Sequence, residues 1–230
     1  MKLTEWPTDI AYLDSEDIHL ISTKSHPWQI ALAKKNNLHN RGDWFSIPQK
    51  YMQCFDKAEL CYVKNTGKYG KGYAKASYQV SQNDPWFWCH FLGDPVMPGS
   101  QGQDAFAQLG GMWAAGSCEV TGRGRALSGS FEYSGQVLPT TKAIYFHLNV
   151  KRFLKKKNVV FFDGHMSINH PDNIIYRFGE HKVGFFKREE LGVPEGKPSE
   201  YYTPEWDKVK ADTNSWINEA INFYEDEENK

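Results

Sequence analysis

Two side chains that can move protons, His90 and Asp104, lie within residues 86–113, WFWCHFLGDPVMPGSQGQDAFAQLGGMW. The imidazole lies in a segment rich in Pro and Gly, and the carboxylate lies in the first turns of a predicted apolar helix. An imidazole base, a carboxylic acid and the free N–H groups of a helix start are what proton abstraction beside a carbonyl requires. The alternative is a histidine that only packs against Trp and Phe, since the spacing along a flexible loop does not fix the distance between His90 and Asp104.

The helix that carries Asp104 is predicted to begin at Ser100 and to end at Gly116. Apolar residues occupy nearly all of its faces, so this helix must be buried. Gly110 and Gly111 each cost about 1 kcal/mol in a helix relative to Ala, and the expected benefit is the close approach of another backbone. We therefore predict a helix pressed against a sheet.

Alternating apolar and polar residues predict strands over 51–63, 73–80, 127–133, 144–150, 159–168 and 174–186. The sequences NTGKYGKG, TGRGRA and PDN are typical of turns between them. Short helices are predicted to start near residues 14–17 and at Pro27. Strands on either side of one long helix, mostly joined by short turns, indicate an antiparallel α+β layer.

The run CHFLGDPVMPGSQGQDAFAQLGGMW closely resembles the active-site segment of the bacterial 3-hydroxydecanoyl-acyl carrier protein dehydratase/isomerase family. The similarity continues through GRGRALSGSFEYSGQVLPT, VKRFLKKKNVVFFDG and KVGFF, and covers roughly residues 47–187. It implies an α+β hotdog fold, in which an antiparallel β-sheet wraps around a long central α-helix. It also implies that His90 is the base, that Asp104 is the acid and that the backbone N–H of Gly99 stabilises the oxyanion.

The reaction implied by the resemblance is dehydration of a 3-hydroxyacyl thioester, carried on acyl carrier protein, to the trans-2-enoyl thioester in fatty-acid or polyketide-type biosynthesis. No metal or redox cofactor is implied. Gln101 and Gln103 stand where the family commonly has two leucines, so trans-2/cis-3 isomerisation stays open. Residues of the same stretch are assigned to substrate binding: Cys89, Phe91, Val96, Pro98, Gln108 and Trp113. The alternatives are a catalytically lapsed acyl-binding or scaffolding hotdog subunit and a hotdog thioesterase.

The resemblance also implies a homodimer whose subunits share the active sites, with His and Asp coming from opposite subunits. A basic turn over residues 151–157 aligns with a basic turn of the family and is a candidate docking surface for acidic acyl carrier protein. The alternative is a solvated hairpin end. The residues assigned to docking are Lys151, Arg152, Lys155, Lys156 and Lys157.

Composition sets the domain organisation and the protein class. The 230 residues are enough for one core with extensions, which we divide into an N-terminal extension (1–45), the hotdog domain (46–188), and a linker with a C-terminal helical tail (189–230). A net charge of −1 gives no general attraction to nucleic acid or acidic membranes. We expect a cytoplasmic protein with reduced thiols, because no signal peptide or membrane-spanning stretch is recognised.

Two further features have simpler interpretations. Asp163, His165, His170 and Asp172 are of types that bind metals, but the segment is better explained as strand, turn and strand, and no metal is expected there. The N-terminal extension is expected to pack on the domain. A docking segment for a larger assembly is the alternative.

Overall fold

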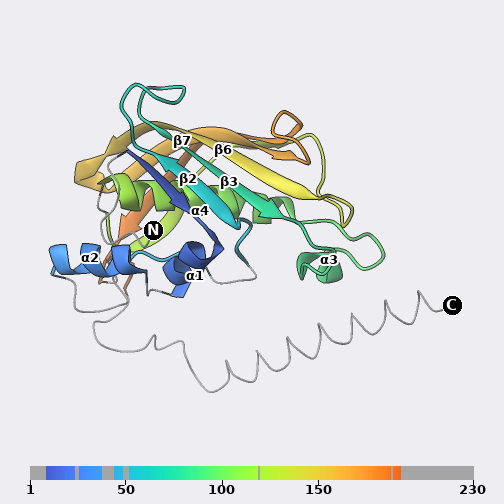
Figure 1. Ribbon diagram of the computed structural model, residues 1–230, viewed down its shortest axis with the longest axis horizontal. Coiled ribbons are helices and arrows are strands. Elements are labelled where there is room, and N and C mark those ends of the chain that lie inside the picture. The colour runs from blue at the N-terminus through green and yellow to red at the C-terminus, as the bar shows by residue number, and fades with distance from the viewer. Residues whose placement is uncertain are drawn as a thin grey trace, which may run out of the picture.

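An antiparallel sheet curls around one central helix, α4 (Gly99–Cys118), in a computed structural model that describes residues 9–23, 26–37, 44–48, 52–118, 120–187 and 189–192 (Figure 1). The strand order is β1-β2-β3-β6-β7-β8-β4, and β5 also pairs with β8. This arrangement confirms the predicted hotdog fold. Within the described ranges, no helix is long and apolar enough to cross a membrane.

The strands predicted over 73–80, 144–150, 159–168 and 174–186 are confirmed, and β2 and β3 form the predicted hairpin. The strands are β1 (Ile10–Leu13), β2 (Lys57–Cys61), β3 (Tyr73–Gln79), β4 (Arg123–Ser128), β5 (Phe131–Tyr133), β6 (Ala143–Leu154), β7 (Val159–Ile168) and β8 (Ile174–Phe186). The other helices are α1 (Ser15–Thr23), α2 (Pro27–Lys35) and α3 (Trp86–Cys89), with 3-10 turns η3 (Lys155–Lys157) and η4 (Glu189–Leu191). The predicted C-terminal helix lies outside the described residues.

Helix α4 is buried because its apolar residues face the sheet on one side and other segments on the rest. Phe106 is fully buried and stacks on Phe178 of β8, with ring centroids 4.1 Å apart. A Cβ at Gly110 would overlap the Phe162 ring, and a Cβ at Gly111 would lie 3.4 Å from the Phe45 ring. The two glycines therefore make room for aromatic rings rather than for the backbone that the sequence led us to expect.

Three sequence predictions about strands are wrong. The turn predicted at TGRGRA is largely strand β4, which lies at the edge of the sheet and pairs with β8 through Gly124 and Phe185. The strand predicted over 127–133 is the end of β4 and all of β5, because the strand is interrupted at Gly129 and Ser130. Strand β6 runs on through Lys151 and Arg152, which are not part of a turn.

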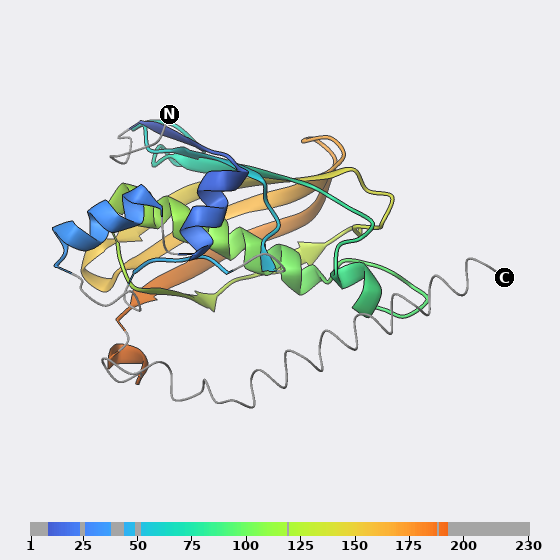
Figure 2. The ribbon, with the colours of Figure 1, turned by 60° about the horizontal axis from the view of Figure 1, so that its bottom comes forward.

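The N-terminal residues add to the sheet as well as packing on it. Strand β1, which the sequence did not predict, pairs with β2 in antiparallel register. Buried Gln29 of α2 joins three segments: its Nε2 donates to the carbonyls of Ile21 (2.9 Å) and Phe45 (2.6 Å), and its Oε1 accepts from the His26 N–H (3.0 Å). Both ribbon views place α1 and α2 beside the C-terminal half of α4 and α3 near its N-terminal end (Figures 1 and 2).

The outer face of the sheet carries one polar row across its strands. Residues paired in register along this row are Tyr12, Glu59, Lys75, His147, His165, Arg177 and Glu132. The central pair, His147 and His165, is half-buried, with ring centroids 5.3 Å apart. Burial lowers the pKa of both rings, and the neighbouring His165 and Lys75 lower the pKa of His147 further, as Arg177 does that of His165.

This pair makes the free energy of unfolding depend on pH. The folded pKa values lie below the ordinary 6.5, so as pH falls through that value the unfolded chain binds protons that the folded chain does not. The contribution of the two neutral histidines to the free energy of unfolding is fully present above about pH 7.5. Below that pH the free energy of unfolding is expected to fall, by at most about 1.4 kcal/mol per pH unit for each histidine. Urea unfolding from pH 8 to 5 measures the slope.

The double variant His147→Gln/His165→Gln should show a shallower slope. His170→Gln is the matched control, because His170 lies in an exposed turn and its loss should leave the slope unchanged. An equally steep slope in the double variant would contradict the assignment.

Candidate active site

His90 ends the short helix α3 rather than lying in an open loop. Asp84 and Pro85 start the helix, where the Asp84 carboxylate accepts from Tyr78 Oη (2.6 Å) and from the Ser81 N–H (3.0 Å). The His90 backbone N–H then donates to the Trp86 carbonyl at 3.0 Å. Because Trp86 is buried, this helix fixes the backbone from which the imidazole projects.

The imidazole of His90 is held by one of its two nitrogens. Nδ1 lies 3.0 Å from the Val96 carbonyl oxygen. A carbonyl only accepts, so in the neutral ring Nδ1 carries the hydrogen and Nε2 carries the lone pair. Among the described residues, Nε2 has no hydrogen-bond partner. His90 thus has the tautomer and the free lone pair of a general base.

Gly99 begins α4, so its N–H belongs to the first turn, whose N–H groups have no carbonyl partner within the helix. A Cβ at this position would lie 2.9 Å from the Tyr133 ring of β5. Glycine is therefore needed for β5 to pack against the helix start. Free N–H groups and the partial positive charge at this end can stabilise a negative oxygen.

Asp104 is positioned by Gln108, one turn further along α4. Gln108 Nε2 donates to Asp104 Oδ2 and, at 2.9 Å, to the Met52 carbonyl. The Oδ1 atom of Asp104 has no hydrogen-bond partner within the described part of the chain. One carboxylate oxygen is therefore fixed, and the other is free to exchange a proton with a ligand.

Asp104 belongs to a stripe along α4 that is only partly covered. We call this the open stripe; it consists of Ser100, Gln103, Asp104 and Ala107. These residues are exposed or half-buried and have the spacing of one helix face, whereas the other described side chains of α4 between residues 101 and 116 are buried. A ligand or a second chain can therefore reach α4 at this face.

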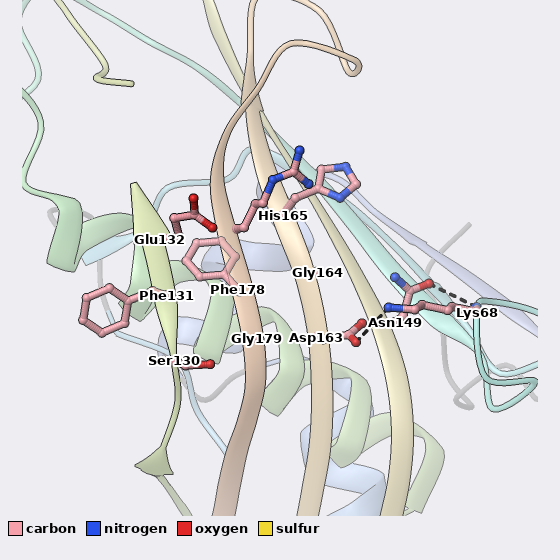
Figure 3. A pocket seen from close by; sticks show the side chains of 11 residues that line it. Lys68, Ser130, Phe131, Glu132, Asn149, Asp163, Gly164, His165, Phe178 and Gly179 are labelled. Carbon is pink, nitrogen blue, oxygen red and sulfur yellow. Dashed lines mark hydrogen bonds and ion pairs between the residues drawn. The ribbon is translucent and has the colours of Figure 1, made fainter. Parts of the chain in front are cut away.

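Within the described residues, no hydrogen bond or ion pair joins His90 to Asp104. Two cavities, of about 650 and 1010 Å³, are lined by residues other than His90 and Asp104. The smaller lies on the outer face of the sheet, where Lys68 pairs with Asp163 near Asn149 and His165 (Figure 3).

The residues assigned to substrate binding do not all gather at this site. Val96 and Pro98 are half-buried beside His90 and Gly99, and Gln108 binds Asp104. Cys89 is exposed, and Phe91 is 57% exposed while stacking on His90 with ring centroids 4.0 Å apart.

Trp113 lies elsewhere. It is nine residues beyond Asp104, or about 14 Å along the helix. Its Nε1 donates to the Cys61 carbonyl at 2.8 Å, and its ring packs on Tyr62.

The basic residues assigned to docking lie at the other end of the fold from His90. Lys151 pairs with Glu180 at 2.8 Å, and the Arg152 guanidinium lies 4.0 Å from the centroid of Phe161. Lys156 and Lys157 are exposed in η3, which also contains Lys155. The turn between β6 and β7 that carries these lysines lies beside Gly184, near the C-terminal end of β8. The start of α4 contacts Tyr176, near the N-terminal end of the same strand.

Two contacts of the site were missed from the sequence. The predicted strand over 51–63 is too long: among the described residues 52–63, the strand is Lys57–Cys61, and Met52 and Cys54 contact α4. There the Met52 carbonyl accepts from Gln108, and Cys54 Sγ lies 3.2 Å from Gln101 Nε2. Burial raises the pKa of the Cys54 thiol to about 12, so it stays protonated. These contacts join distant segments, so no local pattern signals them.

The residues of metal-binding type do not form a metal centre. Asp163 accepts from Lys68 and Tyr69, and His170 pairs with Asp172 at 3.5 Å in an exposed turn. Over the ranges described, no group of three or more His, Cys, Asp or Glu side chains is placed to hold a metal ion.

Comparison with known proteins identifies the family of this chain. The family model of the FabA-like domain matches residues 47–178, more than half of the chain. Among solved structures, the dehydratase heterocomplex ApeI:P from Xenorhabdus doucetiae is 15% identical with a TM-score of 0.46, over 62% of this chain and 89% of that one. A hypothetical thioesterase with coenzyme A from Streptococcus pneumoniae TIGR4 is 10% identical with a TM-score of 0.41, over 58% and 89%.

The (R)-hydratase from A. caviae involved in PHA biosynthesis is 12% identical with a TM-score of 0.38, over 50% of this chain and 94% of that one. These three proteins carry different activities, so the likeness to them does not select a reaction. The family match covers both His90 and Asp104. The chain belongs to the FabA-like domain family.

Proposed function

We propose that this protein is a 3-hydroxyacyl thioester dehydratase in fatty-acid or polyketide-type biosynthesis. The observation that carries the proposal is the imidazole of His90, whose Nδ1 is held by Val96 while Nε2 keeps a free lone pair. A base fixed in this way can remove a proton from C2 of a bound thioester.

The other groups fit the remaining steps of dehydration. The N–H of Gly99 would stabilise the negative charge that develops on the thioester oxygen as the C2 proton leaves. Asp104, with one oxygen fixed by Gln108, would donate a proton to the C3 hydroxyl, which then leaves as water. The C2–H and C3–O bonds break, a C2–C3 double bond forms, and no electrons are gained or lost.

The proposed active unit is a homodimer, in which His90 of one subunit meets Asp104 of the other. Two features support this: no hydrogen bond or ion pair among the described residues joins His90 to Asp104, and apolar side chains are exposed around the helix start. The exposed apolar residues at this end are Phe91, Leu92, Phe131 and Tyr133. Leu127, Phe131 and Tyr133 belong to β4 and β5, which form an edge of the sheet, and exposed edges readily pair with another chain.

The proposed substrate carrier is acyl carrier protein, which would bind the basic hairpin end through Lys156 and Lys157. Both side chains are exposed and can attract an acidic partner. Because this end is remote from His90 of the same subunit, the carrier would have to deliver the thioester over the length of the fold or to the other subunit's site.

The test is product analysis with a 3-hydroxyacyl thioester. Dehydration predicts the trans-2-enoyl thioester, with mass lower by one water and with the thioester bond intact. Release of free thiol would show a thioesterase. Saturable binding without turnover would show a lapsed subunit, and either of these two results would overturn the proposal. Mass spectrometry of the reaction mixture separates all three.

A further inference from the structure

The hydroxyl group of Tyr133, in β5, lies beside the helix start that carries Gly99. The atom nearest to an added Cβ at Gly99 is Tyr133 Cζ, at 2.9 Å. Cζ is the ring carbon that bears the hydroxyl group, so Oη is attached directly to the atom that lies closest to Gly99. Within the part of the chain that the structure describes, Oη has no hydrogen-bond partner. Tyr133 is 41% exposed, so a ligand at the helix start can reach it.

The ring of Tyr133 is held in this place from three sides. It packs edge-on against Tyr176 of β8 with ring centroids 4.5 Å apart, and its centroid lies 5.1 Å from that of Phe131. Gly99 forms the third side. Strand β5 also pairs with β8 in register at Tyr133 and Tyr176. The hydroxyl group therefore cannot turn away from the helix start without the loss of these contacts.

The segment that precedes α4 connects Tyr133 to His90. The Val96 carbonyl holds His90 Nδ1 at 3.0 Å. The next residue, Met97, donates through its N–H to the Val137 carbonyl at 3.0 Å. Val137 is buried and follows β5 closely in the chain. The imidazole, the helix start and the phenol therefore belong to one connected unit.

A neutral phenol at this position can act as a hydrogen-bond donor. Partial burial raises the pKa of Tyr133 above its ordinary value of 10.0, so the hydroxyl group keeps its hydrogen near neutral pH. O–H and N–H donors that converge on a carbonyl oxygen stabilise the negative charge that develops there when the neighbouring carbon loses a proton. The Gly99 N–H is one such donor, and Tyr133 Oη can supply a second.

We propose that Tyr133 is a further catalytic residue, whose Oη donates a hydrogen bond to the thioester oxygen of the substrate together with the Gly99 N–H. This inference rests on the proposed dehydratase function. It adds no proton transfer: His90 takes the C2 proton, and the O–H bond of Tyr133 stays intact. Because the hydrogen bond strengthens as charge builds up on the oxygen, it lowers the barrier rather than only binding the substrate.

The experiment replaces Tyr133 by Phe, which removes the hydroxyl group and keeps the ring against Gly99 and Tyr176. Steady-state kinetics with a 3-hydroxyacyl thioester should show kcat lowered by about tenfold or more, with little change in KM. The matched control is Tyr145→Phe. Tyr145 is half-buried in β6, on the same face of that strand as His147, and its variant should keep the wild-type kcat.

Infrared difference spectra test the contact with the thioester oxygen directly. The probe is a saturated acyl thioester labelled with ¹³C at its carbonyl group, which lacks the C3 hydroxyl and so cannot be dehydrated. Loss of a donor should shift the carbonyl band of the bound probe to higher wavenumber in Tyr133→Phe, and the band should stay in place in Tyr145→Phe. Circular dichroism checks that both variants are folded.

The outcomes separate the two proposals. If the wild type converts no 3-hydroxyacyl thioester, the dehydratase proposal falls and the role of Tyr133 falls with it. If the wild type is active, an unchanged carbonyl band or an unchanged kcat in Tyr133→Phe overturns the role of Tyr133 alone. A weaker dimer in sedimentation equilibrium, with kcat unchanged, would show that the hydroxyl group binds the other subunit instead.

Discussion

Replacing His90 by Ala is expected to lower kcat by about a hundredfold or more while the fold is kept. The reason is that His90 Nε2 is the free lone pair beside the start of α4, and a general base contributes this much when it is removed. Asp104→Asn should have an effect of similar size, because an amide keeps the shape of the carboxyl group and the contact with Gln108 but cannot donate a proton as an acid. Steady-state kinetics with a 3-hydroxyacyl thioester measures both effects.

The controls are residues of the same types outside the proposed chemistry. Asp94 is exposed in the loop that follows His90, and His170 is exposed in the β7–β8 turn, so Asp94→Asn and His170→Ala should keep wild-type rates. Mixing and refolding the two inactive variants should restore about a quarter of the wild-type activity, since half of the random dimers then contain one intact site. Wild-type rates in either His90→Ala or Asp104→Asn would contradict the assignment.

Gly164→Ala is expected to destabilise the protein by about 3 kcal/mol or more, the range of severe core overpacking. A Cβ at Gly164 in β7 would overlap the carbonyl oxygen of His147 on the paired strand, and it would lie 2.9 Å from the ring of buried Phe106. The overlap is with backbone, so no side-chain rotation relieves it. The loss is measured as a lower free energy of unfolding in urea.

Gly124→Ala is the matched control, because Gly124 is also a strand glycine but has no atom within 4 Å of an added Cβ. Its effect should stay within about 0.5 kcal/mol. Equal unfolding midpoints for the two variants would show that β6 and β7 separate at Gly164 more easily than the packing implies.

The sequence predicted the parts of the fold whose pattern is local and strong. Helix α4 is apolar on most faces between two glycine-rich ends, and β6 to β8 alternate clearly over many residues. Strand β1 was missed because it has only four residues, too few for a period to be recognised. Strand β4 was taken for a turn because Gly and Arg are uncommon in strands, but at a sheet edge they are tolerated.

The residues proposed for the candidate site came from the resemblance, whereas the contacts that support them were only partly readable from the sequence. His90, Gly99 and Asp104 stand in one motif, so resemblance was enough to name them. The Gln108 contact could be read from helical spacing, since Asp104 and Gln108 are four residues apart. The Met52 and Cys54 contacts with α4, and the packing of Phe45 near Gly111, depend on tertiary packing between segments that are distant in sequence, and nothing local marks them.

The central claim, that His90 exchanges the C2 proton of a thioester, is tested most directly by incubating a trans-2-enoyl thioester with the enzyme in D₂O. Because dehydration is reversible, the account predicts a 3-hydroxyacyl thioester that carries deuterium at C2 with the wild type, and negligible incorporation with His90→Ala. Incorporation at the wild-type rate without His90, or thioester cleavage with no deuterium at C2, would contradict it.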